Sequence, residues 1–392
     1  MQKTIGTPEG TRDRLFAECA ACRRVETAVT DVFGRQGYSE LTTPSVEYYD
    51  IIAATGHPLT QESMMKIVDR TGKILVMRPD NTVAIGRVAA TKLKGLPLPL
   101  RLYYNQTVFR SDDAHTGARS EIDQCGVELI GAEGLRADLE VISLSISALE
   151  ACGLQDYHIE IGHAGYFGAL LKQLALPEET GQQLRMLLEN KELTAYEAAL
   201  APYTDTPAGK TLRKLPRLFG GAEVLETAKS LCPDEEAAAV IAYLETLYRV
   251  LKDAGLSGRV QFDLGLVHSI EYYTGIVFRG YGQGAAGNVL SGGRYDKLIG
   301  QFGAPVSATG FALDVEAVAS CLPVPEHQKP ETVVYYTLDS LAAARCRVEA
   351  KAPGTAMLSC ADSPEQARQE ARTLGAKRLI LLEHGRETEE LL

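Results

Sequence analysis

The sequence lacks the features that would place the chain in a membrane or a secretory pathway. No apolar run among its 392 residues approaches the ~20 residues that a membrane-spanning helix needs. The first residues, Met1 to Gly6, contain no hydrophobic stretch of the kind that forms the core of a secretion signal. We therefore expect a cytoplasmic protein that does not bind membranes.

Cysteine is too sparse to form a structural framework. Eight cysteines are spread along the chain, so reduced thiols are expected rather than the dense disulfides of a small secreted domain. Cys19 and Cys22 have the spacing of half a zinc site, but no second pair stands at ligand spacing, and we expect no metal. Both lie in an apolar stripe from Leu15 to Phe33, which predicts a helix with the two cysteines in its core.

Positive charge is in deficit, because 40 Lys and Arg face 51 Asp and Glu for a net charge of −11. This balance argues weakly against a nucleic-acid-binding protein, since a local basic patch can exist on an acidic chain. The hydrophobic content of 45% and the charged content of 23% are those of ordinary globular proteins. The length predicts two or three domains at roughly 150 residues each.

The first third of the chain has strand patterns separated by two helical ones. Asp80, Asn81 and Thr82 have the residue types that cap a helix, here from Val83 to Leu93. Two strand-like segments farther on are separated by a polar, turn-prone stretch, which predicts a long-looped antiparallel hairpin. The predicted strands are Tyr38 to Glu47, Lys73 to Pro79, Arg101 to Arg110 and Ser120 to Ile130.

The remainder divides into a helical region, further strands and a small terminal unit. Residues 165–258 have a helical pattern, which predicts an all-helical insertion. Residues 323–330 are rich in proline and form a predicted linker between a domain at 1–322 and a small α/β domain at 331–392. Helices follow Glu133 and Asp314, and strands are predicted at His158 to Gly162, Val260 to Leu264, Glu271 to Tyr281 and Ala308 to Leu313.

A glycine-rich segment at residues 282–287 matches the Gly-x-Gly-x-x-Gly pattern of dinucleotide sites. That pattern binds a pyrophosphate only when a helix follows it, and here Asn288, Val289 and Leu290 continue as strand. We predict a loop between antiparallel strands and no cofactor.

The predicted hairpin carries the most informative polar residues. Strand alternation places Gln124 and Glu128 on one face of their strand, with Gly126 leaving room between them. On the partner strand, alternation places Arg110 on the same face of the sheet. Such a face is costly to bury unless a polar ligand or mutual pairing satisfies it. A binding site and a solvent-exposed face both remain possible on the pattern alone.

Six segments in order make the chain resemble histidyl-tRNA synthetases, which are class II aminoacyl-tRNA synthetases, over most of residues 1–322. The resemblance implies the class II fold, an antiparallel sheet flanked by helices, and a homodimer formed through the second of the segments. The segments are Thr7 to Asp13, Gly37 to Glu47, Val108 to Glu128, Glu271 to Phe278, Ser291 to Leu298 and Gly310 to Leu313.

Departures from the synthetase pattern fall on the arginines that hold ATP. The resemblance places arginines where this chain has Asp113, Ala118 and Ala317, and another, central to adenylate formation, near His268. Adenylate formation needs cations on the phosphates. Losing three charge-assisted hydrogen bonds would cost about 4–9 kcal/mol if they are additive. We therefore expect no synthetase activity and no catalytic residues.

The residues that the family uses for histidine itself are retained. The resemblance implies that Asp80, Thr82 and Gln124 hold the α-amino group and that Glu128 and Tyr273 hold the imidazole. It also implies that Tyr295 lines the pocket and that Arg110 pairs with the ligand carboxylate. The expected histidine-binding residues are Asp80, Thr82, Arg110, Gln124, Glu128, Tyr273 and Tyr295.

A pocket that retains histidine recognition without phosphate chemistry is similar to that of the regulatory subunits of ATP phosphoribosyltransferase, which are synthetase paralogues of histidine biosynthesis. This resemblance implies a non-catalytic subunit that activates a short-form catalytic subunit, often as a hetero-octamer, and confers feedback inhibition by histidine. Residues 331–392 resemble a truncated anticodon-binding domain with 8 basic and 10 acidic residues, so no tRNA partner is expected. A divergent histidyl-tRNA synthetase and a stand-alone amino-acid-binding module remain as alternatives.

Overall fold

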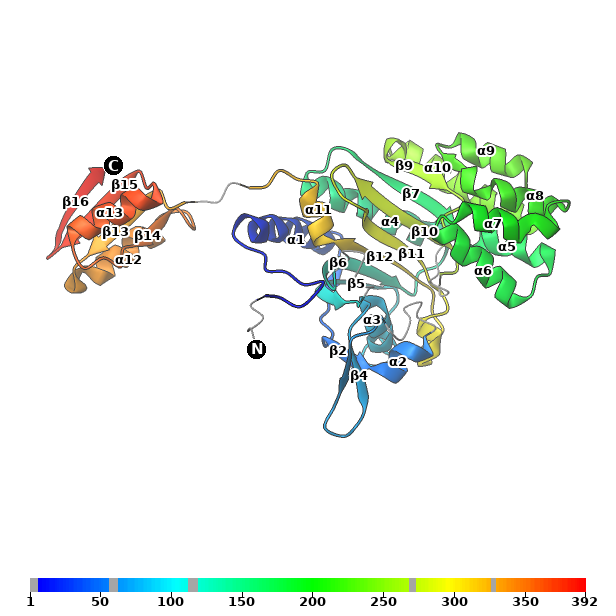
Figure 1. Cartoon of the computed structure of the whole chain (residues 1–392), viewed down its shortest axis with the longest axis horizontal. Helices are drawn as coiled ribbons and strands as arrows, with labels where there is room; N and C mark the ends of the chain where they lie inside the picture. Colours follow the sequence, from blue (N-terminus) through cyan, green and yellow to red (C-terminus); the bar gives the residue numbers. More distant parts are fainter. Residues whose placement is uncertain (1–5, 56–62, 112–118, 268–272, 326–328) are drawn as a thin grey trace. The chain divides into compact units, whose positions relative to one another are not determined.

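The computed structural model describes residues 6–55, 63–111, 119–267, 273–325 and 329–392. The chain separates into two units, Met1–Val324 and Pro325–Leu392. Figure 1 follows the chain through both.

A nine-stranded sheet forms the centre of the first unit. Its order is β1-β5-β6-β12-β11-β10-β7-β9-β8, in which the β1–β5 and β7–β9 pairs are parallel and the other neighbours antiparallel. This confirms the predicted antiparallel sheet, including the β5–β6 hairpin. The strands are β1 (Ser39–Glu40), β5 (Leu100–Phe109), β6 (Glu121–Ile130), β7 (Tyr157–His163), β8 (Phe219–Gly220), β9 (Val260–Asp263), β10 (Ile276–Gly282), β11 (Asn288–Arg294) and β12 (Ala308–Asp314).

Helices cover both faces of this sheet (Figure 1). Helices α1 and α4 pack on the face that carries Cys125 and Val127, whereas α2 and α3 pack on the face that carries Tyr104. Each helix presents an apolar stripe to the sheet, as Val25, Val29 and Phe33 do from α1. The helices are α1 (Ala17–Arg35), α2 (Tyr49–Ala54), α3 (Asn81–Ala90), α4 (Gly134–Cys152) and α11 (Val315–Ser320).

The region between β7 and β9 is mainly helical and gathers at one end of the sheet, in green in Figure 1. The two-residue strand β8 also lies there and pairs with β9. The elements are α5 (Ala164–Leu174), α6 (Glu178–Glu189), α7 (Leu193–Leu200), η1 (Ala201–Tyr203), α8 (Pro207–Lys214), η2 (Leu215–Arg217), α9 (Glu223–Ser230), α10 (Glu235–Asp253) and η3 (Ser257–Arg259).

The second unit is a four-stranded sheet in the order β14-β13-β15-β16 with a helix on each face. Strand β16 was not predicted from the sequence, because it has no apolar alternation. Its side chains are mostly exposed, since it lies at the edge of the sheet. Its elements are β13 (Thr332–Tyr336), α12 (Leu341–Glu349), β14 (Ala356–Leu358), α13 (Pro364–Leu374), β15 (Arg378–Glu383) and β16 (Arg386–Leu391).

Some element boundaries predicted from sequence were wrong. The strand expected from Tyr38 to Glu47 is two strands in different sheets, because Pro44 lies between them and has no N–H to donate. The strand expected from Glu271 begins at Ile276, and Glu271 lies outside the described residues. A small sheet, β2-β4-β3, holds β2 (Val46–Tyr48), β3 (Lys66–Val68) and β4 (Ile74–Met77).

The predicted apolar stripe of the first helix begins too early. Helix α1 starts at Ala17, so Leu15 precedes it and is 59% exposed. Cys22 is buried as expected, but Cys19 is exposed and its thiol donates to the carbonyl of Arg14 at 3.0 Å. No cluster of metal-ligating side chains occurs among the residues that the structure describes.

Candidate functional site

All seven residues expected to bind histidine line one cavity of about 110 Å³. The cavity lies on the α3 side of the large sheet, where β6, β11 and β12 are neighbours. Five further lining residues were not predicted to belong to the site, since their types are ordinary for a sheet core. These are Tyr104, Ser291, Gly310, Phe311 and Ala312.

Five segments of chain bring these side chains together. Gln124 and Glu128 share one face of β6 by strand alternation, and Gln106 and Leu102 lie opposite them on β5. Arg110 follows β5 directly. Asp80 and Thr82 come from the start of α3, whereas Tyr273 precedes β10 and Tyr295 follows β11.

Glu128 is the buried acid at the base of the cavity. Its side chain is 2% exposed, and burial raises the pKa of its carboxyl to about 8. Thr82 donates its hydroxyl to Glu128 Oε1 at 2.7 Å, and the Tyr295 hydroxyl donates to Glu128 Oε2. These hydrogen bonds favour the carboxylate and offset part of the cost of burial.

Two glycines decide the shape of the cavity. A Cβ at Gly310 would lie 2.2 Å from Glu128 Oε2, so glycine leaves the space that this carboxylate occupies. A Cβ at Gly126 would lie 2.4 Å from the Tyr104 hydroxyl. The room that Gly126 was expected to leave between Gln124 and Glu128 is therefore occupied by Tyr104, a fully buried ring missing from the predicted set.

The other end of the cavity is built around the start of α3. Asp80 is the N-cap, and its Oδ1 accepts the Val83 N–H at 3.1 Å, which confirms the predicted cap. Asn81 donates to Gln124 Oε1 at 3.4 Å. Within the described part of the chain, Asn81 Oδ1 is a buried oxygen that accepts no hydrogen bond. Arg110 donates through Nε to the carbonyl of Pro79 at 3.2 Å, which ties it to the same turn.

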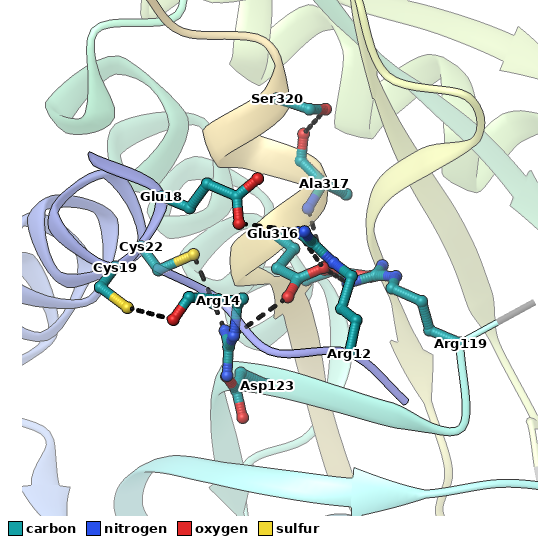
Figure 2. A network of polar contacts seen from close by, with 11 residues as sticks. Arg12, Arg14, Glu18, Cys19, Cys22, Arg119, Asp123, Glu316, Ala317 and Ser320 are labelled. Carbon is teal, nitrogen blue, oxygen red and sulfur yellow. Dashed lines mark hydrogen bonds and ion pairs between the residues drawn. The ribbon is translucent and has the colours of Figure 1, made fainter. Parts of the chain in front are cut away.

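A second cavity, of about 420 Å³, opens beside α11, where the resemblance to synthetases places an arginine and this chain has Ala317. Figure 2 shows that the arginines nearby point at carboxylates. Glu316 contacts Arg119 at 2.8 Å, Arg14 at 3.2 Å and Arg12 at 3.5 Å.

The remaining contacts of this network engage the same arginines again. Arg12 pairs with Glu18 at 3.0 Å, Arg14 with Asp123, and Arg119 with Asp314. Three arginines thus face four acids, a local charge of −1 that does not attract phosphate. The other expected departures, Asp113, Ala118 and His268, lie outside the described residues.

No helix in the described residues is long and apolar enough to cross a bilayer.

Comparison with known proteins places the chain among two related groups. The histidyl-tRNA synthetase family matches residues 10–318. An ATP phosphoribosyltransferase regulatory subunit of Clostridium acetobutylicum is 41% identical over 318 residues, which cover 80% of this chain and 78% of the relative. Another, from Clostridium kluyveri, is 38% identical over 379 residues, which cover 94% of this chain and 97% of the relative.

A crystal structure of an ATP phosphoribosyltransferase regulatory subunit/histidyl-tRNA synthetase from Bacillus halodurans is similar to the whole chain. It superposes with a TM-score of 0.87 at 31% identity, and the match covers 98% of this chain and 99% of that one. The fold expected from sequence is confirmed.

Proposed function

The chain belongs to the family of ATP phosphoribosyltransferase regulatory subunits, and from this premise we propose that it is a non-catalytic subunit that binds histidine. It activates a separate short-form catalytic subunit, and histidine reverses the activation. The observation that carries this proposal is the contrast between the two cavities, since one retains groups suited to an amino acid and the arginines described at the other are already paired with carboxylates.

The first cavity has a group for each end of histidine. Asp80, Thr82 and Gln124 supply oxygens for the α-ammonium group, and Arg110 supplies a guanidinium for the carboxylate. Glu128 and Tyr273 face the imidazole. Burial raises the pKa of the Glu128 carboxyl to about 8, and an imidazolium or a donated imidazole N–H beside it would favour its carboxylate form. Tyr295 holds Glu128 in place.

The second cavity supports the non-catalytic part of the proposal. Ala317 cannot bind a phosphate, and Arg12, Arg14 and Arg119 already bond to carboxylates, so ATP would have to break these ion pairs. We expect no histidine-dependent exchange between ATP and pyrophosphate. Exchange above the background of a buffer control would favour a synthetase instead.

Feedback requires that histidine bind one state of the assembly more tightly than another. In this proposal the catalytic partner transfers phosphoribosyl from phosphoribosyl pyrophosphate to N1 of ATP, and four copies of each subunit assemble around dimers of this chain. Histidine binds the less active arrangement of the assembly more tightly than the active one, and it therefore shifts the population toward the less active arrangement.

The experiment is to measure phosphoribosyl-ATP formation by the short-form catalytic subunit from the same organism, with and without this chain. We expect the rate to rise as the chain is added and to saturate at equal subunit concentrations. An unchanged rate, with no complex in sedimentation velocity, would contradict the proposal.

A further inference from the structure

Helix α8 and the turn η2 that continues it are divided into an apolar face and a basic face. Ala208, Thr211, Leu212, Leu215 and Leu218 are buried at helical spacing in the interior of the helical region. The opposite face carries Lys210, Arg213, Lys214 and Arg217, and all four are exposed.

The four cations have no acidic partner within the described part of the chain. They follow one another at i, i+3, i+4 and i+7, so they share one stripe of helix surface. Residues 207–218 contain these four basic residues and no acidic one. Among the described residues none of the four forms an ion pair, whereas exposed arginines such as Arg23 and Arg347 do. Like charges three and four residues apart destabilise a helix, and the helix dipole offsets this only in the last turn.

The place of α8 in the fold leaves this stripe accessible. Figure 1 shows α8 at the outer edge of the helical region, far along the first unit from α1 and α11. The histidine cavity is lined by none of the residues of α8. The stripe therefore does not serve the site already described.

We propose that this basic stripe is a docking surface for an acidic surface of the catalytic subunit, an inference that rests on the proposed function. A net charge of −11 weakly disfavours a long polyanion, whereas a carboxylate patch on a folded partner needs only a local match. Phe219, which is 49% exposed, follows the stripe two residues after Arg217. Arginine and exposed aromatic rings are enriched at protein interfaces. The stripe thus fits a protein partner better than RNA.

The test reverses two charges of the stripe and compares the result with a matched reversal elsewhere. Lys210→Glu with Arg213→Glu changes the stripe, and Arg249→Glu with Lys252→Glu changes an exposed pair at the same spacing on α10. Both variants alter net charge equally. Circular dichroism and histidine affinity show that each variant is folded.

The readout is the Kd for the catalytic subunit at low and high salt. We expect the stripe variant to bind ~10-fold or more weakly at low salt, with the loss shrinking at high salt as charges are screened. The α10 variant should bind within about twofold of the unmodified chain.

Equal affinity for both variants and the unmodified chain would overturn the docking surface, and so would equal losses in both. Weakened binding to RNA with unchanged binding to the catalytic subunit would also overturn it, in favour of a nucleic-acid surface. If the unmodified chain itself neither binds nor activates the catalytic subunit, the proposed function fails, and that result is distinct from a failure of the stripe alone.

Discussion

At the scale of single residues, the site depends on one carboxyl group in an unusual environment. Glu128 lies beneath Tyr295 and Thr82, with space kept open by Gly310. In the folded chain burial keeps its proton bound up to about pH 8, whereas an unfolded chain releases it near pH 4.5. The same group therefore links ligand binding to the stability of the fold.

This linkage predicts how stability depends on pH. Between about pH 4.5 and 8 the folded state holds a proton that the unfolded state has lost, so stability falls as the pH rises, by roughly 1.4 kcal/mol per unit at most. Glu128→Gln should remove this trend. Urea unfolding without histidine should show the variant equal to the unmodified chain near pH 5 and more stable by a few kcal/mol above pH 8.

The control for this prediction is Glu197→Gln, which changes an exposed glutamate on α7. Its pH profile should run parallel to that of the unmodified chain. Parallel profiles for Glu128→Gln as well would show that Glu128 titrates normally.

At the scale of elements, the start of α3 combines an observed role with a proposed one. Asp80 caps the helix and lines the cavity that we propose binds histidine, so in this proposal one carboxylate has a structural role and a binding role. The two roles separate in substitution, because asparagine caps a helix as well as aspartate does but carries no charge.

We predict that Asp80→Asn keeps the free energy of unfolding within about 0.5 kcal/mol and weakens histidine binding, whereas Asp80→Ala also loses about 1 kcal/mol of stability. Denaturant unfolding and calorimetry measure the two effects. Unchanged histidine affinity in Asp80→Asn would mean that its charge does not hold the amino group.

How much the sequence predicted also differs from element to element. The β5–β6 hairpin and its polar face followed from a period of two, and Asp80 followed from the residue types of an N-cap. Tyr104 and Gly310 did not, because a tyrosine and a glycine in core strands look ordinary until the facing strands are known. The basic stripe of α8 was within a region that sequence analysis assigned only as helical.

At the scale of the whole molecule, the charge distribution separates three regions. The cavity that we propose binds histidine is lined mainly by polar side chains, the cavity beside α11 holds arginines paired with acids, and the cations on the exposed face of α8 form no ion pair among the described residues. The domain limits predicted at 1–322 and 331–392 stay a prediction, as does the relation of the second unit to anticodon-binding domains. In the proposed function, regulation depends on how histidine binding in the first region alters contacts made elsewhere.

The central claim is that histidine acts through the cavity around Glu128, and one measurement tests it most directly. Phosphoribosyl-ATP formation by the reconstituted assembly is followed across a histidine titration, with the unmodified chain and with Glu128→Ala. Leaving partner groups unpaired should cost about 1–3 kcal/mol, so half-inhibition should need about 5- to 150-fold more histidine in the variant. An unchanged midpoint for inhibition in Glu128→Ala would contradict the account and place the histidine site elsewhere.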